Sequence, residues 1–222
     1  RPIEEAEHPL PVRRIVLFLY RHEWRQAGEA AYEAVENGTL APYDEPTAEM
    51  AIRMYARVTG DYARAEAMLT QKSGVTWDQD GRPIVPRQMG VATATVGLGD
   101  ILMAGGQPKR ARLLLLASIA DMDYVSQKLG RGDFWYAKDR AVALALLGQR
   151  DAAIEQIGRA ITTHYGTCQW QLFLRDEPVF AGLRDDARFK KMLADVRAHA
   201  AAEHELLNKM RAAGLVPDRR KP

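Results

Sequence analysis

Cysteine, long apolar runs and an excess of one charge are all scarce or missing in this chain of 222 residues. The single cysteine, Cys168, excludes an internal disulfide and an all-cysteine metal site. No stretch approaches the ~18 consecutive apolar residues that a membrane helix requires, so we expect no membrane insertion. The chain has 31 basic and 29 acidic residues and so lacks a large basic excess, and direct binding of nucleic acid is therefore not expected either.

Patterns that would indicate catalysis or metal binding are also missing. There is no Gly-x-Ser-x-Gly element, and the glycines near Gly97 and Gly105 lack the strand and Lys-Ser/Thr pair of a phosphate loop. His199 and Glu203 lie one helical turn apart, but the pattern offers no third metal ligand. We therefore predict that the chain is not an enzyme and needs no metal and no cofactor.

What the sequence does contain is a small signature repeated four times. Ala27, Ala65, Ala111 and Ala153 each follow a glycine or polar turn, and each precedes an apolar or small residue four positions later. They lie 38, 46 and 42 residues apart, against a period of about 34 in one common helical repeat. A small residue at this point allows two helices to approach closely, so the signature predicts stacked helix–turn–helix units.

These anchors predict an all-α chain of about four helix pairs with additional segments around them. The expected pairs span residues 12–37, 47–72, 91–121 and 134–164. An insertion over 73–90 carries two short β-prone runs around an Asp-Gly turn, and so predicts a small hairpin or Ω-like loop. Capping helices are expected over 165–216, a linker over 1–11 and a tail over 217–222.

The run Gly60-Asp61-Tyr62-x-x-Ala65, with the third and fourth units, resembles tetratricopeptide repeats over roughly two thirds of the chain. Arg53 departs from that pattern, because a small residue is usual at its position. The stretch from Leu172 to Phe189 is similar to the closing segment of C-terminal repeat domains in bacterial multidomain signalling proteins. Those proteins include CadC/ToxR-like winged-helix regulators, adenylate cyclases and Ser/Thr kinases.

The resemblance implies a right-handed α-α superhelix that serves as a non-catalytic protein or peptide interaction module, or as a sensory module. Its parent would be a bacterial signalling or transcription-regulating protein. The chain opens on Arg1-Pro2 without an initiator Met, so we expect a fragment. A membrane-tethered parent would place it in the periplasm, and any other parent in the cytoplasm.

In such repeats the first helix of each pair lines a concave face that usually receives a peptide. The pattern places on that face Tyr20, Met50, Met54, Arg57, Asp100, Met103, Phe134 and Lys138. Methionine and aromatic side chains offer adaptable apolar contact, and the two cations would bind a carboxylate. Contacts between repeats explain the same residues equally well, so both interpretations remain open here.

Two further alternatives concern the insertion and the partner. Trp77 is a candidate partner contact, because it is an aromatic residue on an inserted loop. A pocket between the concave face and residues 73–90 would instead favour a small-molecule sensor. The expected partner is a protein or peptide, with self-association as a variant of that prediction.

Overall fold

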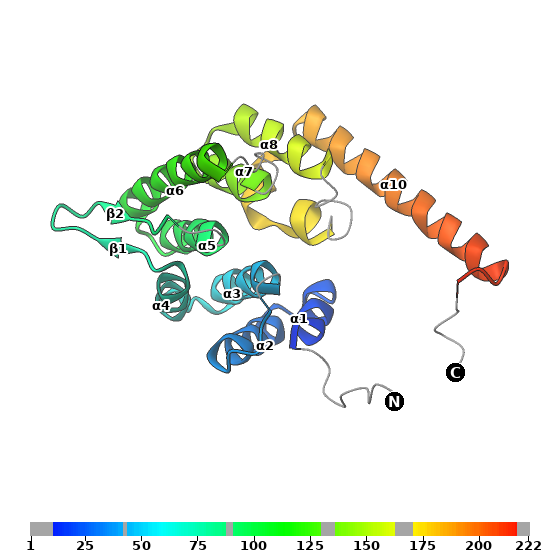
Figure 1. The fold of residues 1–222 in the computed structure, drawn as a ribbon, viewed down its shortest axis with the longest axis horizontal. Helices are drawn as coiled ribbons and strands as arrows, with labels where there is room; N and C mark the ends of the chain where they lie inside the picture. Colours follow the sequence, from blue (N-terminus) through cyan, green and yellow to red (C-terminus); the bar gives the residue numbers. More distant parts are fainter. Residues whose placement is uncertain (1–10, 42–43, 88–90, 130–135, 163–170, 217–222) are drawn as a thin grey trace.

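The computed structural model describes residues 11–41, 44–87, 91–129, 136–162 and 171–216. Over these ranges the chain is all-α apart from one small antiparallel hairpin, which confirms the all-α class with a small β-like insertion (Figure 1). The helical pairs are α1 (Pro11–Tyr20) with α2 (Trp24–Glu36), α3 (Glu45–Thr59) with α4 (Tyr62–Ser73), α5 (Val91–Ala104) with α6 (Pro108–Leu129), and α7 (Ala137–Leu146) with α8 (Arg150–Thr162).

Small residues lie where neighbouring helices touch. Ala27, Ala65, Ala111 and Ala153 are all 0% exposed, as their use as anchors requires. Helices α2 and α3, α4 and α5, α5 and α6, and α7 and α8 form the most extensive contacts. The role of small residues in helix pairing therefore holds in the described part of the chain.

The helix boundaries follow local capping rules. Gly60 adopts φ +78°, which ends α3, and the Asp61 carboxylate then accepts a hydrogen bond from the Arg64 amide at 3.1 Å. The second pair was expected to begin at residue 47, but α3 begins at Glu45 after Asp44, with Pro46 in its first turn. Helix α6 also runs past the expected end at residue 121.

The insertion forms the expected hairpin, with β1 (Thr76–Trp77) antiparallel to β2 (Pro83–Ile84). The Asp78 carboxylate accepts hydrogen bonds from the amides of Asp80 at 3.0 Å and Arg82 at 2.8 Å. These bonds are ordinary turn chemistry, which explains the acidic residues without a bound cation.

The C-terminal segment divides into three parts. A π-helical turn η3 (Gln171–Asp176) contacts α1, a 3-10 turn η4 (Pro178–Leu183) contacts α7, and α10 (Ala187–Ala212) contacts α8 before it extends away from the body (Figure 1). The sequence predicted capping helices over 165–216, and α10 packs against α8 of the fourth pair. The turns η3 and η4 lie along the inner side of the helices, because Glu177 between them is bound by Arg53 of α3.

Candidate functional site

A buried arginine is the centre of the most highly charged region among the described residues. Arg53 is 3% exposed, and its guanidinium binds the Glu177 carboxylate in a fork, with Nη2–Oε2 at 2.7 Å and Nη1–Oε1 at 3.0 Å. Nη1 also donates to Asp100 Oδ2 at 2.8 Å, and Nε forms an ion pair with Glu49 Oε1 at 2.6 Å. Such bidentate, charge-assisted contacts need the planar fork of arginine.

We call this region the inner charge cluster. It comprises Glu49, Arg53 and Arg57 of α3, Asp100 of α5, Lys138 and Asp139 of α7, and Glu177 between η3 and η4. The three α3 residues share one helical face, because they follow one another at intervals of four. Four separate segments of the chain therefore supply charge to one buried place.

Local packing makes room for this cluster. A Cβ atom added at Gly97 of α5 would lie 2.0 Å from Glu49 Oε1. The absence of a side chain at Gly97 thus allows the Glu49 carboxylate to rest against α5, where it meets Arg53. Glu177 has a second task, because its Oε1 accepts a hydrogen bond from the Val179 amide and caps η4 at 3.3 Å.

The buried carboxyl groups titrate differently from one another. Burial raises the pKa of Glu49 to about 7, even though Arg53 acts in the opposite direction. Burial also raises the pKa of Asp139, while Lys138 and a hydrogen bond from Thr93 oppose that rise. Burial likewise disfavours ionisation of Glu177, but the Arg53 fork outweighs it and the pKa of Glu177 is lowered.

The charges of the cluster do not balance. Four carboxyl groups face three cations, and Arg57 and Lys138 are only partly buried. With every group ionised the cluster carries one negative charge in excess. Because the pKa of Glu49 is about 7, this side chain gains or loses its charge near neutral pH.

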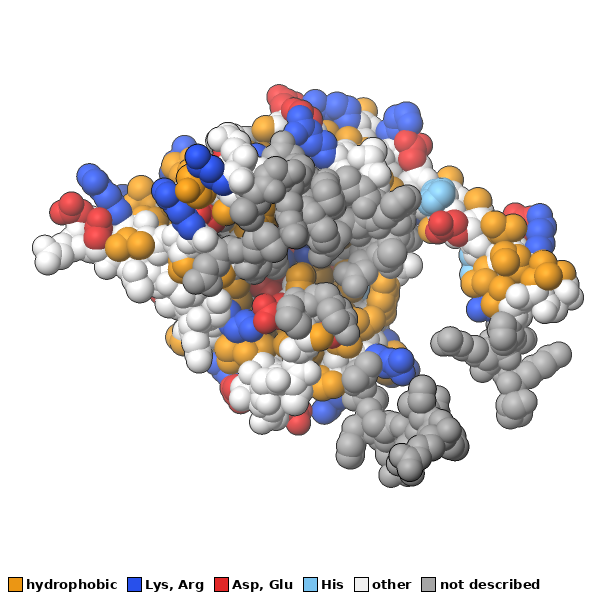
Figure 2. All heavy atoms as spheres, viewed as in Figure 1, with side chains coloured by type: hydrophobic (Ala, Val, Ile, Leu, Met, Phe, Trp, Pro, Cys, Tyr) orange, Lys and Arg blue, Asp and Glu red, His pale blue; other side chains and the backbone are white. Residues whose placement is uncertain are grey.

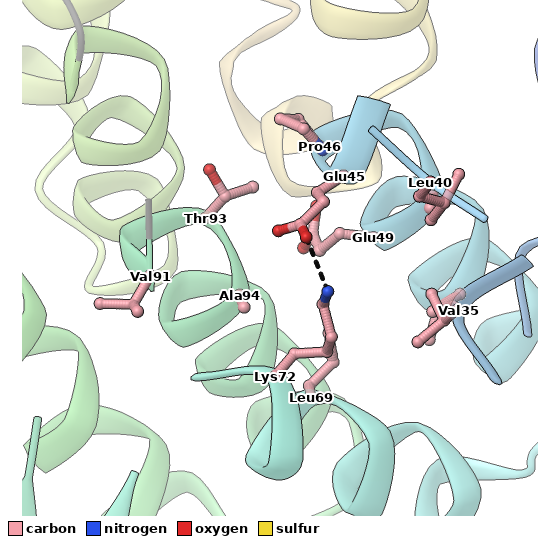
Figure 3. A pocket seen from close by; sticks show the side chains of 12 residues that line it. Val35, Leu40, Glu45, Pro46, Glu49, Leu69, Lys72, Val91, Thr93 and Ala94 are labelled. Atoms are coloured by element: carbon pink, nitrogen blue, oxygen red, sulfur yellow. Dashed lines mark hydrogen bonds and ion pairs between the residues drawn. The ribbon is translucent and has the colours of Figure 1, made fainter. Parts of the chain in front are cut away.

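Beside Glu49 lies a cavity of about 330 Å³, between the ends of α2 and α4 and the starts of α3 and α5 (Figure 3). Its wall is mostly apolar and includes Val35, Leu40, Ile52, Leu69 and Val91. The polar groups that line it are Glu45, Glu49, Lys72 and Thr93, and Lys72 donates to Glu45 at 2.8 Å. A largely apolar wall with a few polar groups is the usual composition of a small-ligand site.

The residues predicted for a concave binding face separate into buried and accessible ones. Met50, Met54 and Asp100 are buried, so in this structure they offer no surface to a partner. Arg57, Met103 and Lys138 are partly buried, and Tyr20 is exposed. The structure brings Arg57, Asp100 and Lys138 into one cluster, whereas Phe134 lies outside the described residues.

The remaining predictions of functional residues agree less well with the structure. The side chain of Trp77 is partly covered, and the Arg110 guanidinium lies over its ring at 4.5 Å. The cavity lies between α2, α3, α4 and α5, and no described residue of the 73–87 insertion lines it. Arg53, Glu49 and Glu177 were not expected as a group, although Arg53 in place of a small residue was the available signal.

Comparisons with known proteins add no further identification. The chain matches no protein-family model, no curated protein and no solved structure. No helix within the described ranges is long and apolar enough to cross a bilayer. Among the same residues, no group of three or more His, Cys, Asp or Glu side chains is arranged to hold a metal ion.

Proposed function

We propose that this chain is a non-catalytic interaction module, related in architecture to tetratricopeptide repeats, that binds an acidic amphipathic segment of a partner protein. The binding surface is the outer face of α6, defined by Leu113, Leu116, Ala120 and Tyr124. One observation carries the proposal: these residues repeat at helical spacing and are exposed, with Leu113 and Leu116 at 44% and 45%.

The inner side of the helices is a poorer candidate for the same task. Glu177 and the turns on either side of it already occupy that side, and the Glu177 side chain is fully buried there. An external peptide would have to displace the Arg53–Glu177 fork before it could bind. We therefore assign the binding surface to α6 rather than to the concave face expected from the sequence.

The charged side chains next to this surface indicate which kind of partner it would bind. The four residues of this outer face form an apolar stripe along α6. Lys109 and Arg112 are exposed beside the stripe, and neither has an ion pair with a described carboxylate. At the other end Arg87 lies over the Tyr124 ring at 4.3 Å and also interacts with the Asp121 carboxyl group, so the positive charge is concentrated at Lys109 and Arg112. Figure 2 shows hydrophobic and basic side chains together in the part of the molecule where Figure 1 places α6.

A second copy of the chain fits this surface less well than an acidic helix. In a two-fold contact the same patch faces itself, so Lys109 and Arg112 would approach the end of the partner stripe where Arg87 and Asp121 offset each other. The two cations would gain no net charge attraction there. An acidic helix places carboxylates beside Lys109 and Arg112, and it also provides the apolar spacing that the stripe requires.

The wider context rests on sequence alone. The similarity of residues 172–189 to closing segments of bacterial repeat domains supports a place in a multidomain signalling or regulatory protein. In that setting the module recruits a partner while a neighbouring domain performs the regulated activity.

The test uses a synthetic helical peptide with leucines on one face and glutamates beside them. We expect measurable binding by fluorescence anisotropy, weakened as salt rises over the range in which exposed charges are screened. Leu113→Glu with Leu116→Glu should abolish binding. Leu206→Glu, an equally drastic change at an exposed position on α10, should leave it unchanged.

Four results would contradict the proposal. The first is equal binding of a matched peptide with lysines in place of the glutamates. The second is unaltered binding by the double variant. The third is binding to anionic lipid vesicles but not to the peptide, and the fourth is self-association that Leu113→Glu with Leu116→Glu removes.

A further inference from the structure

The cavity beside Glu49 differs from the outer face of α6 in both shape and charge. Val35 and Leu40 lie on one side of it and Val91 and Ala94 on the other, so an apolar group entering it lies between two apolar walls (Figure 3). Its volume of about 330 Å³ is near the lower end of ligand pockets, which enclose ~300–1,000 Å³. The size suits a small aliphatic or cyclic group rather than a peptide.

The polar groups are concentrated on one side of this cavity. Figure 3 shows the carboxylates of Glu45 and Glu49 and the ammonium of Lys72 directed toward the same space. Lys72 already pairs with Glu45. Glu49 is 92% buried as a side chain, and Arg53 is its ion-pair partner, through Nε and Oε1.

The charge imbalance of the inner charge cluster is exposed to the same cavity. Arg53 is shared among three carboxylates, and Lys138 lies close enough to act on Glu49, Asp139 and Glu177 together. When all four carboxyl groups of the cluster are ionised, these cations leave one negative charge uncompensated. Glu49 is the member of the cluster that lines the cavity, so a ligand there meets that charge directly.

We propose that the cavity is a binding site for a small hydrophobic amine, whose ammonium group binds Glu49 while its hydrocarbon part contacts Val35, Leu40 and Val91. The ammonium supplies the positive charge that the cluster lacks, and three N–H donors reach the Glu49 carboxylate and its neighbours. The hydrocarbon part leaves water for an apolar wall. A neutral ligand would gain only the second effect, and a carboxylate would be repelled.

This site has a characteristic dependence on pH. The groups that face Glu49 are Glu45, Arg53, Lys72, Asp100, Lys138, Asp139 and Glu177. Since the pKa of Glu49 is about 7, its carboxylate becomes fully charged as the pH rises from about 6 to about 8. A primary amine remains protonated there, because its pKa is about 10, so affinity should increase across this range.

The experiment compares three probes of one shape by isothermal titration calorimetry. They are cyclohexylmethylamine, cyclohexylmethanol and cyclohexanecarboxylate, each titrated into the full chain at pH 6 and pH 8. We expect the amine to bind about tenfold more tightly than the alcohol at pH 8, and the acid not to bind. The amine preference should shrink at pH 6.

Two variants locate the site. Glu49→Gln keeps the shape of the side chain and should remove both the amine preference and its pH dependence. Ala94→Met fills the cavity from α5 and should abolish binding of the amine. Ala120→Met makes the same change on the exposed outer face of α6 and should bind the amine as the original chain does.

The proposal fails if no probe binds, or if the alcohol and acid bind as well as the amine. It also fails if Ala94→Met, shown to be folded by circular dichroism, binds the amine with unchanged affinity. Because Glu49 contacts Arg53, the Gln variant is interpreted only if its melting curve is cooperative. Ala94→Met leaves the inner charge cluster intact and decides the question by itself.

Discussion

The inner charge cluster and the outer face of α6 reverse the usual distribution of polarity in a folded protein. In the first, seven charged side chains lie together on the inner side of the helices, and five of them, the four carboxyl groups and Arg53, are buried. In the second, leucines and a tyrosine are exposed on a solvent-facing helix. This difference indicates that the inner charge cluster and the outer face of α6 serve different functions.

Buried charge demands complete pairing, because an ionised group without a partner in a low-dielectric interior is very costly. Arg53 satisfies this demand by contacting three carboxylates at once. An exposed apolar stripe has no such internal requirement. The cluster is therefore constrained by folding, whereas the stripe is explained better by a partner.

The largest expected effect follows from removing the cation at the centre. Arg53→Met leaves Glu49 and Glu177 buried without their partner, and should lower the free energy of unfolding by about 3–5 kcal/mol. Arg57→Met at the edge of the cluster should cost about 1 kcal/mol, because Asp100 keeps Arg53. Urea unfolding followed by circular dichroism measures both, and equal losses would contradict the central role of Arg53.

A smaller effect is expected from pH. The pKa of Glu49 is about 7 in the folded chain against an ordinary value of 4.5, so the folded state binds the extra proton between these values. Stability should therefore fall as the pH rises from about 4.5 to about 7, by on the order of 1–3 kcal/mol. Glu49→Gln should flatten the profile, and an unchanged slope would assign the dependence to another group.

The smallest effect should come from the outer face. Leu113→Lys with Leu116→Lys changes two exposed side chains that pack little, so the free energy of unfolding should alter by no more than about 0.5 kcal/mol. Thermal melting of the double variant checks this. A loss of several degrees would mean that the stripe contributes to folding, and the assignment to a partner would lose its basis.

The sequence predicted the helices well because their signals are local. The anchor alanines, the Gly60-Asp61 turn and the hairpin depend on neighbours a few residues away, and each was found where the pattern placed it. The expected start of the second pair at residue 47 was two residues late, because Pro46 also fits the first helical turn and α3 begins at Glu45.

The inner charge cluster was not predictable in the same way. Arg53 and Glu177 are 124 residues apart in the chain, and neither carries a local mark that identifies the other. The repeat pattern assigned Met50 and Met54 to a binding face because periodicity tells which side of a helix is apolar. It does not tell whether that side meets solvent, another helix or a returning segment, and here these methionines are buried.

The fork between Arg53 and Glu177 affects how the chain unfolds. In an open array of repeats each unit touches only its neighbours, so the ends can fray while the middle persists. Here the second helix pair is fastened to a segment that follows the fourth, and the intervening units are held as a closed loop. The second pair cannot separate from the C-terminal segment without breaking this fork, which couples regions far apart in the chain and favours a single cooperative transition.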